Sequence, residues 1–347
     1  MNRRSVSNHW LLGGFLFSLA ANPLPAATSP ETTLSQRVAS SIRSVAREKS
    51  GSLVRVRCRD QRGEVNGTGF QIDPTGTICT LAELVLPGGE ITVSQGPGEY
   101  PATPIAIDPR SGVAFLKVGA SGDGAMTPEG ALFLPPTSLT NTPQFTPVVG
   151  MGLPRGEQAA LSLGMITGTQ AYEKNRYFCV PHLTAAIALS EGEAGSPVLD
   201  LSGNLVGMVM GGGSAACLIL PSGAIEKLNH DILRYGRINP GWVGAVVEEA
   251  AVPEGNSRTR VVSIEPGSPA ETAGLRVGDM IVSLSGKAIR EPEEILGASF
   301  YLSGGEKVRM NFVRGGESRT IDFRCAELPD AMAAAGGSSS ETPLVQH

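Results

Sequence analysis

The sequence predicts a mainly β protein with two or three modest domains. Between residues 51 and 220, short runs rich in Val, Ile, Thr and Leu, such as Leu53–Arg57 and Val113–Val118, alternate with Gly or Pro turns. The 347 residues include 44 Gly and 25 Pro but only 5% aromatic and 18% charged residues, which suits many turns around small cores. Many short strands at this spacing indicate antiparallel β-barrels or sandwiches.

The first 27 residues have the order of a secretory signal peptide. Arg3 and Arg4 precede an apolar run from Trp10 to Ala21, and small residues follow up to Ala27. A membrane anchor is the alternative, but an apolar run of about a dozen residues is shorter than the roughly 20 that a spanning helix needs. We therefore expect residues 1–27 to be removed and the remainder, without a spanning segment, to be periplasmic or secreted.

Helices are expected on either side of the strand-rich region. Residues 28–50 are predicted to form a polar tether and then a helix, because Val38, Ile42 and Val45 recur at helical spacing. The tether is expected to run from Thr28 to Gln36. A second helix is predicted from Ala224 to Tyr235.

The strand-rich part divides into two units. The first unit is expected to span 51–236, with a Pro-rich connector of low charge near 119–147 in its middle. The second unit is expected to span 237–326. The tail 327–347, with its Ala, Gly and Ser runs, is predicted to be disordered.

The charge of the chain argues against nucleic acid and anionic membrane surfaces as partners. The formal net charge is −5, and removal of a leader that contains two Arg residues lowers it to −7. The sequence contains no basic cluster interleaved with aromatic residues.

The five cysteines indicate neither a metal site nor a fixed disulfide pattern. They form no CxxC pair and have no His at metal-ligand spacing, so we expect no metal and no cofactor. An exported location permits disulfides, and buried reduced thiols are an equal alternative. An odd number leaves at least one thiol without an intramolecular partner. The cysteines are Cys58, Cys79, Cys179, Cys217 and Cys325.

A series of motifs resembles the HtrA family of exported serine proteases over nearly all of the chain after the leader. After the first predicted helix come a Gly67–Phe70 strand, an Asp108–Ser111 loop and a Gly-rich elbow before Pro197–Asp200. The most specific match is Glu265–Ile281, which resembles the PDZ signature of that family. The resemblance implies a trypsin-like double six-stranded β-barrel at 51–236, followed by an α+β PDZ domain at 237–326.

The resemblance also assigns the three catalytic positions, and none carries its catalytic side chain. Glu83 stands at the position of the His, Gly112 at that of the Asp, and Ala194 at that of the Ser. A trypsin-like site needs a Ser nucleophile, a His base and an orienting Asp. The chain is therefore interpreted as a degenerate member, a pseudoprotease.

No other residue offers a clear replacement for the triad. After the leader, His182, His230 and His347 remain, and none lies in a segment that resembles the His-bearing loop. Ser190 and Ser196 flank the nucleophile position at offsets from which neither side chain should reach the cleft.

The elbow is expected to persist as a vestigial oxyanion turn formed by Gly192, Glu193 and Gly195. Its backbone N–H groups would still donate hydrogen bonds to a bound carbonyl or carboxylate. The alternative is a turn kept only because the barrel needs it, and the Glu193 charge would repel an anion.

The PDZ domain is where the resemblance implies ligand binding. Such domains take a C-terminal or extended peptide as an added strand, with the carboxylate held by backbone N–H groups. Pro240 replaces a basic residue that many relatives carry, and Arg237 is a candidate substitute. Trp242 is a core residue in the alternative interpretation. The expected peptide-binding residues are Gly241, Trp242, Val243, Gly244, Ala245, Val246, Val247, Ile295 and Ser299.

In trypsin-like second barrels the strand before the elbow neighbours the last strand. The resemblance therefore makes a contact or disulfide between Cys179 and Cys217 a prediction, with a Cα separation within about 7 Å.

Three functions remain open at this point. The first is a non-catalytic scaffold or adaptor that binds exposed peptide segments or C-termini of exported proteins. The second is a serine endopeptidase with a relocated nucleophile. The third is a structural subunit that assembles with an active HtrA-like protease or with itself. The sequence names neither the peptide nor the oligomeric state, nor any ligand of the former protease cleft.

Overall fold

The computed structural model describes residues 30–85, 88–119, 132–154, 159–171, 180–190, 192–213, 216–251, 257–329 and 345–346. The expected signal peptide, residues 120–131 of the expected connector, Cys179 and His347 lie outside these residues. The chain separates into two compact units, Met1–Ala39 and Ser40–His347, and all contacts below lie within the second.

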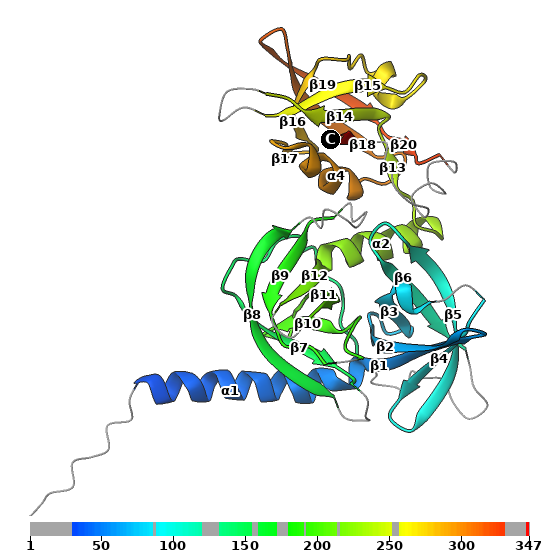
Figure 1. Cartoon of the computed structure of the whole chain (residues 1–347), viewed down its shortest axis with the longest axis vertical. Coiled ribbons are helices and arrows are strands. Elements are labelled where there is room, and N and C mark those ends of the chain that lie inside the picture. Colours follow the sequence, from blue (N-terminus) through cyan, green and yellow to red (C-terminus); the bar gives the residue numbers. More distant parts are fainter. Residues whose placement is uncertain are drawn as a thin grey trace, which may run out of the picture. The chain divides into compact units, whose positions relative to one another are not determined.

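Six antiparallel strands close the first barrel, in the order β1-β2-β3-β6-β5-β4 (Figure 1). Its interior is apolar, and Val54, Val56 and Leu116 are completely buried within it. The strands are β1 (Leu53–Asp60), β2 (Gly63–Gln71), β3 (Thr77–Leu81), β4 (Glu90–Gln95), β5 (Gly98–Asp108) and β6 (Val113–Val118).

The second barrel repeats the plan, in the order β10-β11-β12-β9-β8-β7. Val148, Val198 and Ile219 belong to its separate interior core. The strands are β7 (Pro147–Gly152), β8 (Ala160–Ala171), β9 (His182–Ala186), β10 (Pro197–Asp200), β11 (Leu205–Gly212) and β12 (Cys217–Pro221). The predicted mainly β, double six-stranded architecture is confirmed.

A third cluster of buried side chains, the shared core, joins the two barrels. Phe70 and Phe115 come from the first barrel, and Met151 and Met208 come from the second. Helix α2 (Ser222–Tyr235) adds Ile225 and Leu228. Burial of large apolar side chains on both sides of the seam stabilises the pairing of the barrels by about 1.5–3 kcal/mol per side chain.

The two expected helices are present, with one difference. Helix α1 (Pro30–Lys49) begins inside the segment expected to be a polar tether. In the second unit its Ile42 and Val45 pack against the shared core, as their spacing predicted. Helix α2 ends at Gly236, whose φ of 71° is left-handed and whose N–H donates to the Ile232 carbonyl at 2.9 Å.

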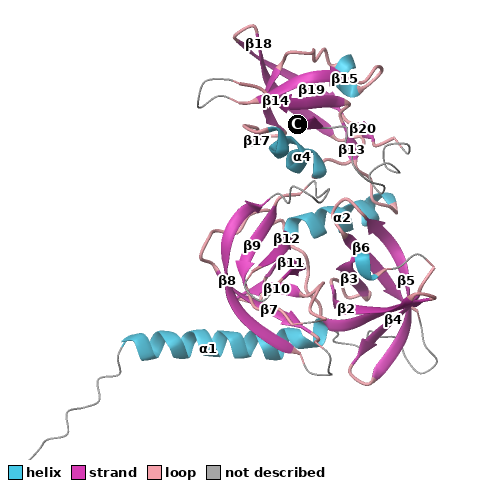
Figure 2. Ribbon diagram, in the orientation of Figure 1, coloured by secondary structure: helices cyan, strands magenta, loops and turns pink. Residues whose placement is uncertain are grey.

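The C-terminal domain, β13 to β20, contains a strongly twisted sheet flanked by two short helices (Figure 2). Its sheet runs β19-β18-β16-β15-β14-β21, with β17 paired to β16, and β13 pairs with β20. The elements are β13 (Gly241–Trp242), β14 (Ala245–Glu249), β15 (Thr259–Ile264), α3 (Pro269–Thr272), β16 (Met280–Leu284), β17 (Lys287–Ala288), α4 (Pro292–Phe300), β18 (Lys307–Arg314), β19 (Glu317–Arg324), β20 (Ala326–Glu327) and β21 (Val345–Gln346).

The Glu265–Ile281 motif is explained by the turn that it builds between β15 and β16. Ser268 caps α3 by accepting the Glu271 N–H at 3.2 Å. The buried Asp279 carboxylate accepts the Arg276 N–H at 2.7 Å and two bonds from the Arg314 guanidinium, both at 2.7 Å.

The tail contains regular structure, in contrast to the expected disorder of 327–347. Glu327 belongs to β20, and β21 pairs with β14 in parallel, with Val345 opposite Val247.

The disulfide predicted between Cys179 and Cys217 is wrong, and the predicted contact involves Cys179, which lies outside the described residues. Cys217 is a free, buried thiol, and its cross-strand neighbour is Ala185. Cys58, Cys79 and Cys325 are also free and buried.

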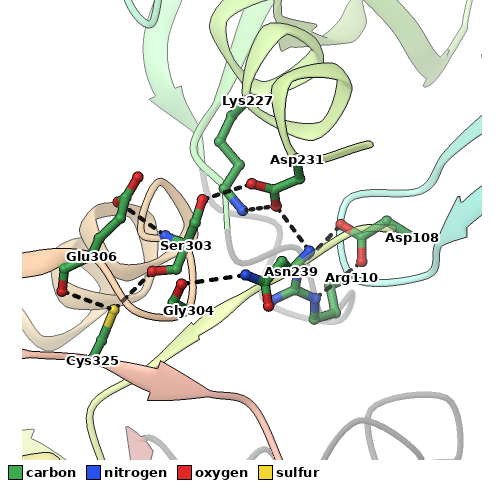
Figure 3. Close-up of polar contacts among 9 residues, drawn as sticks. All are labelled: Asp108, Arg110, Lys227, Asp231, Asn239, Ser303, Gly304, Glu306 and Cys325. Carbon is green, nitrogen blue, oxygen red and sulfur yellow. Dashed lines mark hydrogen bonds and ion pairs between the residues drawn. The ribbon is translucent and has the colours of Figure 1, made fainter. Parts of the chain in front are cut away.

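A buried carboxylate joins α2 to the C-terminal domain (Figure 3). Asp231 pairs with Lys227 at 2.5 Å and accepts the Asn239 N–H at 3.0 Å and the Ser303 hydroxyl at 2.6 Å. The Lys227 ammonium also lies 5.8 Å from the centre of the Phe300 ring, at the end of α4.

We predict that Asp231→Ala lowers the free energy of unfolding by about 3–5 kcal/mol, because it leaves the Lys227 ammonium and two polar groups buried without an acceptor. Chemical denaturation measures this change. The control is Asp322→Ala, which breaks the exposed Arg309–Asp322 pair and should cost at most about 1 kcal/mol. Equal losses in the two variants would contradict the role assigned to Asp231.

We also predict that His182 makes the fold sensitive to acid. Burial lowers the pKa of His182 to about 4. The unfolded chain, with a His pKa near 6.5, then binds one proton more than the folded chain between the two values. Stability should fall by about 3 kcal/mol as the pH falls from about 6.5 to about 4.

His182→Gln should remove this slope, and His230→Gln, on the exposed side of α2, should keep it. Denaturant titrations at several pH values make the comparison. A slope that survives in His182→Gln would assign the acid sensitivity to another group.

Candidate functional site

The elbow loop, Gly192–Ser196, connects to β10 with a conformation that requires glycine. Gly192 and Gly195 have φ values of 91° and 85°, in the left-handed region. The Gly195 N–H donates to the Val209 carbonyl at 3.0 Å, and a Cβ at Gly195 would lie 2.2 Å from the Thr68 carbonyl oxygen. The backbone of the elbow loop therefore lies directly against the backbone of β2 in the first barrel.

Thr68 on β2 is the residue that holds the elbow loop against the first barrel. Its N–H donates to the Ala194 carbonyl at 2.9 Å and its hydroxyl donates to the Gly192 carbonyl at 2.9 Å. The hydroxyl also accepts the Leu153 N–H at 3.0 Å. Sequence reasoning used the Gly67–Phe70 motif as a family mark and missed this role.

The three assigned catalytic positions lie along the same seam. Glu83 belongs to the 3-10 helix η2 (Ala82–Leu84) directly after β3, and the Ala82 N–H donates to the Gly112 carbonyl at 2.8 Å. A Cβ at Gly67 would touch both the Leu84 side chain, at 2.5 Å, and the Ala194 carbonyl, at 2.9 Å. The backbone thus brings the three segments together.

The side chains at these positions offer little chemistry. Glu83 is exposed, Gly112 has no side chain and takes a left-handed φ of 72°, and Ala194 carries a half-buried methyl group. Among the described residues, no acceptor takes the N–H of Gly192 or of Ala194. Within that part of the chain, both amides are available to donate to a ligand oxygen.

Glu193 behaves differently from the expectation that it repels an anion at the turn. Its side chain is buried, and its carboxylate accepts the Ser190 N–H. Its Cγ and the Ser196 hydroxyl lie 2.6 Å and 2.7 Å from where a Cβ of Gly152 would stand. Glu193 and Ser196 therefore face the end of β7, inside the second barrel.

The carboxylate loop, Gly241–Gly244, is held from one side by the C-terminal domain. The Val243 carbonyl accepts the Ala270 N–H at 3.0 Å, and the Gly244 carbonyl accepts the Glu265 N–H at 2.9 Å. In a trans peptide the N–H points away from the preceding carbonyl. The N–H groups of Gly244 and Ala245 are therefore directed away from α3 and β15, as an external carboxylate would require.

The start of the loop is committed to the fold instead. The Gly241 N–H donates to the Leu302 carbonyl at 2.9 Å, and Gly241 and Trp242 form β13, which pairs with β20. Gly241 and Trp242 are therefore excluded as anion-binding residues, and Val243 and Gly244 remain. Trp242 is half-buried.

Gly244 is required by the loop itself. Its φ is 80°, and a Cβ there would lie 2.2 Å from the Ser268 Cβ. The space that a side chain at Gly244 would need is taken by Ser268, the cap of α3.

Strand β14 and helix α4 flank the expected peptide groove. Val243, Ala245 and Ile295 are partly buried and pack against the same apolar core, so an apolar surface continues from the loop to α4. The Ser299 hydroxyl donates to the Leu296 carbonyl at 3.0 Å, within its own helix. Glu291 and Glu294 form a capping box at the start of α4.

The basic substitute considered for the carboxylate loop is engaged elsewhere. Arg237 pairs with Glu327 at 2.6 Å on the surface. The donors expected for a bound carboxylate are therefore the backbone N–H groups of Gly244 and Ala245.

Neither a metal cluster nor a membrane helix occurs in the described part of the chain. No three His, Cys, Asp or Glu side chains there are grouped as metal ligands would be. None of the helices described there combines the length and apolar character that a membrane crossing requires.

Two family models match the chain. A trypsin-like peptidase domain matches residues 67–208, and a PDZ domain matches residues 260–314. The first match contains the elbow loop and Thr68, and the second contains the motif between β15 and β16.

Curated relatives are described as probable periplasmic serine endoproteases, DegP-like. The one from Ectopseudomonas mendocina is 28% identical over 298 residues, which cover 80% of this chain and 60% of the relative. The one from Chlamydia trachomatis is 26% identical over 286 residues, which cover 78% of this chain and 55% of the relative. The chain thus spans about three fifths of the length of the curated relatives it matches.

Solved structures share the fold. The HtrA-type protease AlgW with tripeptide has a TM-score of 0.66 and 18% identity, covering 83% of this chain and 97% of that one. A serine endoprotease from Yersinia pestis has a TM-score of 0.60 and 19% identity, covering 83% and 98%. The family models and the curated relatives together show that the chain belongs to the HtrA family, with a trypsin-like peptidase domain followed by a PDZ domain.

Proposed function

We propose that this chain is a non-catalytic HtrA-type protein whose PDZ domain binds exposed peptide segments or C-termini of exported proteins. The observation that carries the proposal is the pair of N–H groups of Gly244 and Ala245, directed away from the domain beside the apolar surface of Ile295. AlgW, which has the same fold, has been solved with a tripeptide and with a decapeptide. The periplasmic description of the curated relatives agrees with a periplasmic or secreted location.

The absence of catalysis follows from the three assigned positions. Ala194 has no oxygen to attack a carbonyl, and neither Glu83 nor Gly112 supplies an imidazole or orients one. The free amides of Gly192 and Ala194 would still bind a carbonyl oxygen, which alone gives binding without covalent chemistry. The former cleft is therefore a second, weaker place for a peptide.

Two other functions have less support. A relocated nucleophile is disfavoured because Ser196 is only 1% exposed and faces the end of β7. A structural subunit that assembles with an active HtrA-like protease, or with its own copies, fits the same fold. Co-purification from the native envelope distinguishes this function from that of an independent adaptor.

We predict that the purified chain neither cleaves an unfolded protein such as casein nor takes up a fluorophosphonate. Ala194→Ser alone should stay inactive, because a Ser without a base loses several powers of ten in rate. Gel analysis and probe labelling measure both properties, with an active HtrA-type protease as the positive control.

Labelling that Ser196→Ala abolishes would contradict the proposal and identify a relocated nucleophile. Rapid turnover by Ala194→Ser would instead show that the His or Asp position has been wrongly assigned.

We predict that Ile295→Asp weakens binding of C-terminal peptides by about tenfold or more, because it places a charge against the apolar end of the ligand. Calorimetry on the full chain, with peptides selected from a C-terminal library, measures the affinity. Val277→Asp is the matched control, since Val277 is an exposed residue of the same domain. Thermal unfolding of both variants checks that the domain stays folded.

Equal affinity of wild type and Ile295→Asp would move the recognition surface away from α4. Gly244→Glu is a poor substitute for this test, because any side chain at Gly244 collides with Ser268.

A further inference from the structure

The edge of the PDZ sheet formed by β14 is paired with β21, near the end of the same chain. Strand β14 pairs with β15 on one side, and on the other side β21 pairs with it, with Val345 opposite Val247 and Gln346 opposite Glu248. The end of the chain accordingly lies in the PDZ domain (Figure 1). An extended peptide that adds a strand to β14 requires this same edge.

We propose that the last residues of the chain act as a tethered internal ligand that competes with external peptides for the edge of β14. This inference rests on the proposed function, because it concerns the same peptide site. It adds that the chain's own C-terminal segment regulates access of external peptides to that site.

The direction of pairing distinguishes the internal ligand from an external C-terminus. Strand β14 begins at Ala245, next to the carboxylate loop, and β21 runs parallel to it. From Val345 to Gln346, β21 therefore runs away from the amides of Gly244 and Ala245. An external C-terminus must run antiparallel to bring its carboxylate to those amides. The internal ligand thus uses strand pairing alone.

The length of the tail suits pairing within one molecule. The Leu328 N–H donates to the Pro240 carbonyl at 3.0 Å, which fixes the start of the tail on the PDZ domain. About 16 residues separate Leu328 from Val345 and span up to roughly 50 Å when extended. A tether of this length holds its end at an effective concentration of about a millimolar, so even weak pairing is populated.

The tail sequence places its strand-forming residues at its end. Gly336, Gly337 and Ser338–Ser340 have low strand propensity, whereas Leu344 and Val345 follow directly after Pro343. The sequence therefore favours strand pairing at the end of the tail, where β21 lies.

The test compares the full chain with a chain truncated after Asp330, and with Gln346→Pro, which removes the backbone N–H that the register directs at β14. Ser339→Pro is the matched control in the same tail. Hydrogen exchange of the segment Ala245–Glu249 is the first measurement. We expect faster exchange in the truncated chain and in Gln346→Pro, unchanged exchange in Ser339→Pro, and no dependence on protein concentration. Unchanged exchange after truncation would overturn the inference, and protection that disappears on dilution would overturn pairing within one molecule.

The second measurement is the affinity for the best peptide from a C-terminal library screened against the truncated chain. Truncation should tighten binding about tenfold if the tail fills the edge for nine-tenths of the time. Equal affinity of the two chains would overturn the competition and leave the proposed function intact. Faster exchange after truncation, without binding of any library peptide, would contradict the proposed function and support the pairing.

The third measurement adds a synthetic peptide of residues 338–347 to the truncated chain. It should restore the protection of β14, and amidation of its C-terminus should not change its affinity. Loss of affinity on amidation would show that the carboxylate loop holds the tail and would overturn the assigned direction.

Discussion

The hydrogen bonds of Thr68 are the constraint on which the protease half of the structure depends. The Thr68 hydroxyl on β2 binds the Gly192 carbonyl and the Leu153 amide, and the Thr68 N–H binds the Ala194 carbonyl. These bonds hold a loop of the second barrel on the first. None of these bonds uses a side chain at positions 83, 112 or 194. The elbow therefore keeps its shape whatever those side chains are. The backbone of the elbow is therefore compatible with Gly112 and Ala194 at the positions that the resemblance assigns to catalysis, since catalytic groups generally cost stability rather than supply it.

The PDZ domain depends on a second constraint, the buried carboxylate of Asp231. Helix α4 carries Ile295 toward the peptide edge, and its last residue, Phe300, enters the shared core of the barrels. The Arg110 guanidinium, in the loop that contains the degenerate Asp position, lies 5.7 Å from the centre of the Phe300 ring. The peptide edge and the former cleft are thus connected through one short helix. A bound peptide could affect the barrels only through a shift of α4. The hydrogen bond between Asp231 and Ser303, which follows α4, restricts such a shift.

Much of this architecture is predictable from the sequence because it is encoded locally. Short apolar runs between Gly and Pro predict the barrels, the spacing of Ile42 and Val45 predicts a helix, and the Glu265–Ile281 motif predicts the PDZ domain. The features that sequence reasoning missed join residues far apart in the chain. Thr68 lies 124 positions from Gly192, and Asp231 lies 72 positions from Ser303. A two-residue strand such as β21 has no periodicity to detect, and the reason for Gly244 becomes visible only when Ser268 is placed beside it.

The central claim is that the chain holds a peptide without cutting it. Native mass spectrometry of the full chain with an excess of a library-selected C-terminal peptide tests both parts in one measurement. The account predicts a non-covalent complex at the summed mass of intact chain and intact peptide, stable over hours of incubation. A covalent acyl adduct or shortened peptide fragments would contradict it.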